Sequence, residues 1–256
     1  MKKNTFLYSI FRWTFFCSTL LFHEVLFAKI PSIESWFKKA VILKSYQQSY
    51  DWLTPWEKRG VRTQTGMALV VRLPVSRNSD LAVIDDKTGL YLLTSAEMVA
   101  DATLLEATRK DMRLPFQAKL VLLDYAANLA ILKIENSKFW DGLNHIEWSP
   151  VKSISKLNTD TIYSLKIKSS QEWEIESGKI QFMEVGHRKI SDTWLPVLKI
   201  NGISNTKQGF PLIQDNKTVG MILKKSNGEA SAIPAQMIIE FLTNSYKEPY
   251  SGLAHR

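Results

Sequence analysis

Many short apolar runs separated by turn residues form the feature that most constrains how this chain can fold. At 256 residues and 45% hydrophobic content, the composition is that of an ordinary globular protein with one large core or two small ones. In the first half of the chain the runs cover residues 40–45, 67–73, 81–84, 90–93, 104–108, 116–123 and 129–134. Such runs predict β-strands, and seven at this spacing predict a closed or nearly closed antiparallel barrel.

The second half repeats the pattern after a polar connection near residues 148–158. Its predicted strands cover residues 161–167, 173–175, 179–185, 195–200, 211–214, 218–223 and 230–233. Pro234 then stands where the first turn of a helix tolerates proline, and Met237, Ile238, Phe241 and Leu242 follow at helical spacing. The second half therefore predicts another barrel, which is followed by one helix.

The first 28 residues have the pattern of a secretory signal. Lys2, Lys3 and Arg12 make the leading region positive, and residues 13–22 form an apolar run of ten. This run is shorter than the about 20 residues that span a bilayer. We therefore expect export, with cleavage near Ala28 and a periplasmic or secreted product.

The single cysteine and the net charge narrow the possible chemistry. Cys17 lies inside the predicted signal, so the mature chain is expected to have no disulfide, no thiol nucleophile and no cysteine-based metal site. Removing three basic residues and one acidic residue with the signal changes the formal charge from +8 to +6. A surplus of this size usually serves solubility, and binding of acidic glycans or lipids by a basic surface stays an alternative.

Three segments carry motifs of a hydrolytic site, each with one reactive residue replaced. The sequence TSAEMV at 94–99 resembles T-x-A-H-x-V, with Glu97 in place of a general-base histidine. The sequence DYAANLA at 124–130 resembles D-x-x-x-D-L-A, with Asn128 in place of the orienting aspartate. The sequence TKQGFPL at 206–212 resembles G-N-S-G-G-P-L, with Gln208 in place of the nucleophile. In order and spacing, these segments resemble the HtrA/Deg family of trypsin-like serine proteases.

Shorter segments extend the resemblance over nearly all of the predicted exported part; they lie at residues 50–52, 55–56, 139–142, 177–180, 219–221 and 232–234. The resemblance implies an all-β protein of the trypsin-like (chymotrypsin) fold, with two antiparallel six-stranded β-barrels and a C-terminal helix. A PDZ domain usually follows the protease unit in that family, and we expect none here because the sequence ends at Arg256. The expected division is signal peptide 1–28, leader with one strand 29–65, N-terminal barrel 66–148, C-terminal barrel 149–233, and helix and tail 234–256.

The three replacements remove the groups that acyl transfer needs. The amide of Gln208 is not nucleophilic at neutral pH, and the carboxylate of Glu97 is a weaker base than imidazole. Asn128 carries no charge to stabilise a protonated base. The resemblance thus implies that no residue of this chain fills a catalytic role.

The loop that would stabilise the oxyanion is altered as well, at Thr206, Lys207, Gly209 and Phe210. Thr206 stands where the family has a glycine, and threonine is strained in the backbone conformation that this glycine adopts. We expect Thr206 to redirect the loop and Phe210, in place of a second glycine, to crowd the turn. The donors of an oxyanion hole are then misplaced.

The resulting prediction is an exported pseudoprotease that binds a peptide or protein in the cleft between the barrels, as a decoy, adaptor or regulator. An active protease relative is a further candidate partner. No cofactor, metal or nucleic acid is expected, a membrane surface is a weaker candidate partner, and His145 and His187 are expected to be surface residues. One alternative keeps a serine endopeptidase with displaced catalytic residues, built on Ser204 or Thr206 with Glu97.

Overall fold

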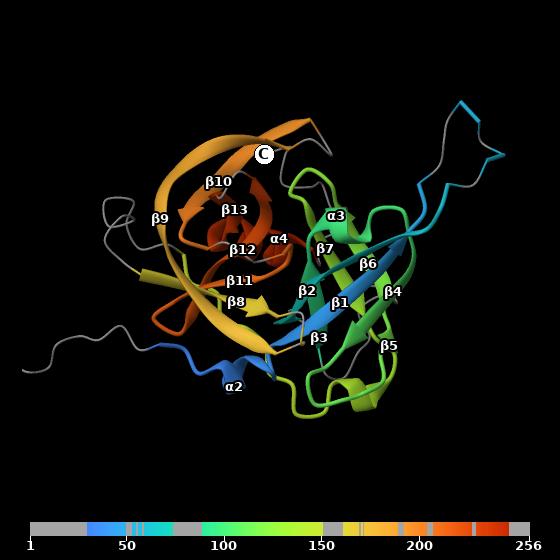
Figure 1. Ribbon diagram of the computed structural model, residues 1–256, viewed down its shortest axis with the longest axis horizontal. Coiled ribbons are helices and arrows are strands. Elements are labelled where there is room, and N and C mark those ends of the chain that lie inside the picture. Colours follow the sequence, from blue (N-terminus) through green and yellow to red (C-terminus); the bar gives the residue numbers. More distant parts are fainter. Residues whose placement is uncertain are drawn as a thin grey trace, which may run out of the picture.

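The computed structural model describes residues 30–49, 53–54, 56–57, 59–73, 89–150, 161–168, 170, 172–188, 192–203, 207–226 and 229–245. The predicted signal, the strand predicted at 81–84, residues 204–206 and the tail from residue 246 lie outside these ranges. Two bodies of β-structure lie side by side in Figure 1. Within the described residues, no helix is long and apolar enough to cross a membrane.

The first body is a curled antiparallel sheet in the strand order β5-β4-β1-β2-β3-β7-β6. Its strands are β1 Ala40–Gln47, β2 Arg62–Arg72, β3 Leu90–Thr94, β4 Ala102–Thr108, β5 Phe116–Gln117, β6 Lys119–Asp124 and β7 Leu129–Lys133. The two edge strands, β5 and β6, are consecutive in the chain and only Ala118 separates them. The backbone N–H of Ala118 donates to the oxygen of Leu105 on β4, 2.9 Å away, and so continues the pairing of β5 with β4.

This first body differs from the expected six-stranded barrel. Its described residues form seven strands, because the predicted strand 116–123 is divided at Ala118 into β5, which pairs with β4, and β6, which pairs with β7. Moreover, β1 from the predicted leader pairs with both β2 and β4 and is part of this sheet.

The second body is a closed six-stranded barrel in the order β10-β13-β12-β11-β8-β9, as expected. Its strands are β8 Thr161–Ile167, β9 Trp173–Arg188, β10 Thr193–Asn201, β11 Pro211–Gln214, β12 Lys217–Ser226 and β13 Glu229–Pro234. The predicted C-terminal helix is α4 Ala235–Asn244, and the other helices within the described residues are α2 Ile33–Trp36, α3 Ala96–Val99 and the 3-10 helix η1 Ser137–Phe139. The predicted all-β class is confirmed.

One prediction in the second half was wrong, because residues 173–175 and 179–185 belong to a single long strand, β9. Gly178, which lies between the two predicted strands, is a point of close strand packing within β9. A Cβ atom there would lie 2.4 Å from the backbone oxygen of Asn201 on β10. Glycine is needed here because the neighbouring backbone leaves no room for a side chain.

Both faces of β2 are buried from Gly66 to Val71, which explains the nearly continuous apolar sequence of this part. Met67, Leu69 and Val71 belong to a core cluster that continues into the second barrel. Ala68 and Val70, on the other face, belong to a second cluster that lies within the first sheet. The two bodies therefore share one hydrophobic core at their junction.

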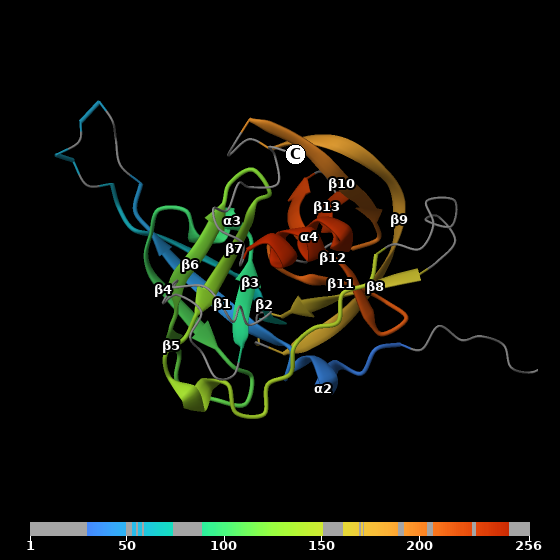
Figure 2. The same cartoon turned by 180° about the vertical axis from the view of Figure 1, so that it is seen from behind.

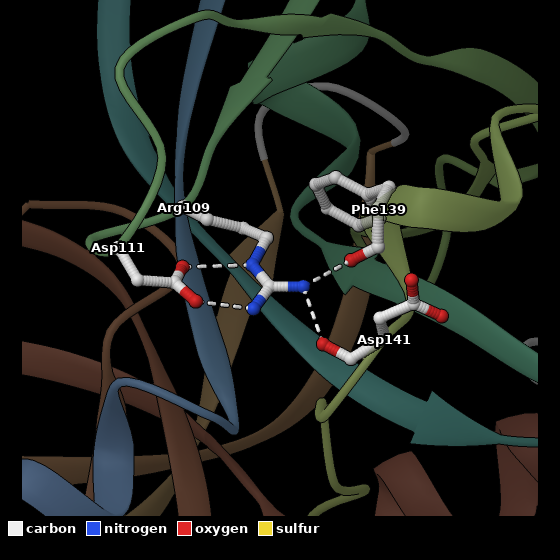
Figure 3. A network of polar contacts seen from close by, with 4 residues as sticks. All are labelled: Arg109, Asp111, Phe139 and Asp141. Carbon is white, nitrogen blue, oxygen red and sulfur yellow. Dashed lines mark hydrogen bonds and ion pairs between the residues drawn. The ribbon is translucent and has the colours of Figure 1, made fainter.

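A buried arginine ties the end of β4 to the segment after β7 (Figure 3). The side chain of Arg109 is 5% exposed and donates through Nη1 to the backbone oxygens of Phe139 and Asp141, each 2.7 Å away. Its Nε and Nη2 donate to the carboxylate of Asp111, with a distance of 2.8 Å for Nε. Loss of this side chain would leave two carbonyl groups without their donor.

We therefore expect Arg109→Ala to lower the free energy of unfolding by about 3 kcal/mol. Urea unfolding followed by circular dichroism measures the change. The control is Arg113→Ala, since Arg113 is exposed four residues further along and should change stability by less than about 0.5 kcal/mol. Equal losses in the two variants would contradict the assigned role of Arg109.

The ion pair between Arg109 and Asp111 also predicts that stability depends on pH. The hydrogen bond from Arg109 holds the pKa of the Asp111 carboxyl below its usual value. A pKa that is lower in the folded than in the unfolded state adds stability above the unfolded pKa of about 3.9, and this stability is lost as pH falls through the folded pKa. Asp111→Asn should thus be less stable than wild type at neutral pH, with a difference that shrinks below about pH 4. A constant difference from neutral to acidic pH would count against the pair.

Candidate functional site

Three separate loops bring Glu97, Asn128 and Gln208 together where the two bodies meet. Glu97 lies in the first turn of α3, Asn128 ends the turn between β6 and β7, and Gln208 precedes β11. The turn before Asn128 is closed by a hydrogen bond from the backbone N–H of Ala127 to the side chain of Asp124, 2.9 Å. Asn128 itself has φ 55°, a left-handed conformation that asparagine tolerates better than most residues.

The three side chains form a hydrogen-bonded chain in the order Asn128, Glu97, Gln208. The side-chain oxygen of Asn128 accepts from the backbone N–H of Glu97 at 3.0 Å, and its Nδ2 donates to Glu97 Oε1 at 3.4 Å. Gln208 Nε2 donates to Glu97 Oε2. The carboxylate thus lies between two amides and uses one oxygen for each.

The amide oxygen of Gln208 is held as firmly as its nitrogen. Gln64 Nε2 on β2 donates to it at 3.0 Å, and Ser95 Oγ donates at 3.3 Å. The backbone oxygen of Gln208 accepts from the N–H of Met67 at 3.0 Å. This residue of the second barrel is therefore fastened to the first sheet by both its side chain and its backbone.

Sequence comparisons identify relatives of the chain. It is 29% identical over 162 residues to a mitochondrial protein of Arabidopsis thaliana described as putative protease Do-like 3, which covers 60% of this chain and 28% of that protein. It is 22% identical over 218 residues to putative protease Do-like 13 of the same plant, which covers 84% and 41%. The chain is a homologue of the Do-like (HtrA) proteases. It spans well under half the length of these relatives, and no protein-family model matches it.

Solved structures of HtrA-type and related proteases share the fold. The active form of the Rv3671c protease from M. tuberculosis superposes with a TM-score of 0.60 at 15% identity, over 85% of each chain. The HtrA-type protease AlgW with a decapeptide gives 0.57 at 15% identity, over 84% of this chain and 67% of AlgW. This HtrA homologue therefore has the trypsin-like fold.

The chemistry of the network differs from that of a serine protease. Ser95 supplies a hydroxyl to it, but this side chain is fully buried and donates to Gln208. The amide of Gln208 is engaged at both its oxygen and its nitrogen, and neither atom is a nucleophile at neutral pH. Among the described residues no group of three or more His, Cys, Asp or Glu could hold a metal ion.

The histidines that the sequence placed on the surface are exposed. His145 lies in the segment after η1. His187 lies on β9 and its Nε2 is 2.6 Å from a carboxylate oxygen of Asp192. Neither side chain has a hydrogen bond to Glu97 or Gln208, so neither replaces the missing base of the HtrA site in this conformation.

The loop after Gln208 packs closely on the first sheet. Gly209 has φ 83°, and its N–H donates to the oxygen of Ile222 at 2.8 Å. Phe210 is 1% exposed and its ring joins the core cluster shared by the two bodies. The expected crowding of the turn by Phe210 is avoided because the ring packs in this core. Of the other expected loop residues, Lys207 is exposed and Thr206 lies outside the described ranges.

We expect Gly209→Ala to destabilise the protein by about 3 kcal/mol, since φ is positive and the new Cβ would lie 1.9 Å from the backbone oxygen of Met67. Gly142→Ala is the matched control. Gly142 also has a positive φ, 71°, but no atom lies within 4 Å of the position that a Cβ would take there, so its cost should stay near about 1 kcal/mol. Thermal unfolding of both variants tests the difference, and equal costs would refute the close packing.

Two members of the network were missed by the sequence analysis. Ser95 lies inside the motif at 94–99, so its position was a signal that could have been followed. Gln64 gave no signal, because it is 144 residues from its partner Gln208 and belongs to no motif. Gln64 lies on β2 opposite Ser45 of β1, and its hydrogen bond to Gln208 makes it part of the network.

Proposed function

We propose that this chain is a proteolytically inactive HtrA-type domain that acts by binding a peptide or protein, as a decoy, adaptor or regulator. The observation that carries the proposal is the continuous hydrogen-bonded chain from Asn128 through Glu97 to Gln208. Each replacement finds a partner in the next one. These residues form a satisfied polar network in place of an alcohol, an imidazole and a carboxylate.

The expected loss of turnover is large enough to support the proposal of an inactive domain. In a well-studied serine protease, removing the nucleophile or the base alone lowers turnover about a millionfold, and removing the whole triad costs little more. Glu97 could accept a proton, but among the described residues the partners of its carboxylate are the amides of Asn128 and Gln208, and neither is an attacking hydroxyl. Hydrolysis near the uncatalysed rate is what this arrangement supports.

Binding is supported by the fold. Proteases of this fold hold an extended peptide by backbone pairing, and such pairing needs no reactive side chain. The Gln208 network fastens the two bodies together, so a binding surface at their junction would be preorganised. The partner is therefore an extended peptide or an exposed strand of another protein, which includes an active protease relative.

The test is retention of peptides without cleavage. Residues 29–256 contain every helix and strand that the structure describes, so this fragment can be immobilised and exposed to peptides of unfolded casein. We expect captured peptides whose masses, measured by mass spectrometry, are unchanged. A basic protein of equal charge and unrelated fold is the control, and equal capture by that protein would refute specific binding. Shortened peptides whose production stops in Ser204→Ala or Thr206→Ala would support the displaced hydrolase instead.

Export is a separate part of the proposal. It rests on the signal pattern of residues 1–28, with cleavage near Ala28 and a periplasmic or secreted product. N-terminal sequencing of the protein recovered from an exporting bacterial host should find residue 29 or a close neighbour first. A product that retains Met1 in the cytoplasm would contradict it.

A further inference from the structure

The segment between β1 and β2 projects from the first sheet, beyond the rest of the two β-bodies in Figures 1 and 2. Its described residues from residue 53 to the start of β2 are 53–54, 56–57 and 59–61, and we refer to these as the β1–β2 tip. Neither the pseudoprotease proposal nor the core of the fold uses them. The tip is therefore available for a separate interaction.

Large apolar side chains at the tip face solvent. Leu53 is 88% exposed, Trp56 77% and Val61 57%. Isolated exposed apolar residues are common on proteins, but three within nine positions on one projection form a concentrated feature. The following β2 residues, from Gly66 onward, are buried, so the change from exposed to buried apolar residues occurs within a few positions.

Hydrogen bonds fix the backbone that carries these side chains. At the base, the N–H of Gln48 donates to the oxygen of Asp101 at 2.9 Å, and Gln48 Nε2 donates to the oxygen of Arg59 at 2.8 Å. At the end, the N–H of Glu57 donates to the oxygen of Thr54 at 2.9 Å. These bonds hold Thr54 to Glu57 and Arg59 to Gln48, and the apolar side chains beside them are exposed.

Two exposed arginines lie next to the apolar residues of the tip. Arg59 and Arg62 are exposed beside the apolar residues, and Glu57 is the acidic residue of the described tip. The whole chain has a formal charge of +8. Arginines close to a bilayer are attracted to anionic lipids, and tryptophan favours the boundary between headgroups and acyl chains.

We propose that the β1–β2 tip inserts Leu53 and Trp56 into the surface of an anionic lipid bilayer, with Arg59 and Arg62 at the headgroups. A bilayer needs only a few inserted side chains, because the binding strength follows the apolar area that is buried. A stable protein interface needs about 800 Å² from each partner, whereas one large aromatic side chain supplies about 150–250 Å². A narrow projection therefore fits a lipid surface better than a protein surface.

The experiment is flotation of residues 29–256 with vesicles of phosphatidylcholine, with and without phosphatidylglycerol. The test variant is Leu53→Ser with Trp56→Ser, and the matched control is Leu114→Ser with Trp194→Ser, which are 76% and 66% exposed elsewhere on the surface. We expect wild type and control to bind the anionic vesicles equally. The test variant should bind them at least about tenfold more weakly. Binding should also weaken without phosphatidylglycerol and with added salt.

Several outcomes would overturn the inference. They are an absence of wild-type flotation, equal binding by wild type and the test variant, and equal losses in the test and control variants. Light scattering that shows a wild-type dimer and a monomeric test variant would assign the tip to contacts between copies of the chain. Circular dichroism confirms that each variant is folded. Peptide capture is measured separately, so failure here leaves the pseudoprotease proposal standing.

Discussion

Restoring the protease side chains with Glu97→His, Asn128→Asp and Gln208→Ser is expected to leave casein hydrolysis close to background. The three positions already exchange hydrogen bonds, so the new side chains start within reach of one another. The resemblance to HtrA proteases, however, also assigns an oxyanion donor to the position of Thr206, where the family has glycine. Without correctly placed donors the triad stabilises too little of the transition-state charge.

Adding Thr206→Gly to this triple variant should raise hydrolysis about 100- to 1000-fold, the usual effect of one oxyanion donor. Lys207→Gly in the same background is the control, since Lys207 is the exposed neighbour in the chain. Full activity in the triple variant alone would show that the donors are already in place. A crystal structure of that variant with the three side chains more than about 8 Å apart would show that the positions are wrongly aligned.

Phe210→Ala is expected to lower the free energy of unfolding by about 4 kcal/mol, within the range for a fully buried phenylalanine. Phe210 is 1% exposed in the core shared by the two bodies, so truncation opens a cavity at their junction. Phe182→Ala is the control, because Phe182 is 47% exposed on β9 and should cost less than about 1 kcal/mol. Urea unfolding distinguishes them, and similar losses would contradict the buried position. A rescue of activity should therefore leave Phe210 in place.

Apolar patterning was enough to predict most strands and the closing helix. The alternation that marks β4 and the apolar run of β2 are local properties of the sequence, and so are Pro234 and the helical spacing after it. The prediction divided the single strand β9 in two because Gly178 has the local pattern of a turn residue. In the structure this glycine instead packs closely against Asn201 on β10. The bend at Ala118 depends on its bond to Leu105, which no local pattern contains.

For the candidate site, too, the sequence predicted the residues within local motifs but not the contacts between distant segments. Motif order was enough to select Glu97, Asn128 and Gln208, and the structure brings these three together. Their mutual hydrogen bonds and the contribution of Gln64 depend on how loops from two bodies meet. The inward direction of Phe210 likewise depends on the shared core and not on its neighbours in the chain.

The most direct test of the central claim is to treat residues 29–256 with a fluorophosphonate probe and, in parallel, with unfolded casein. We expect no labelled protein and no casein fragments above the level of a buffer control, because Gln208 provides no nucleophile. Labelling or turnover that disappears in Ser95→Ala, Ser204→Ala or Thr206→Ala would identify a working nucleophile, and it would contradict the proposal that this HtrA homologue binds without cutting.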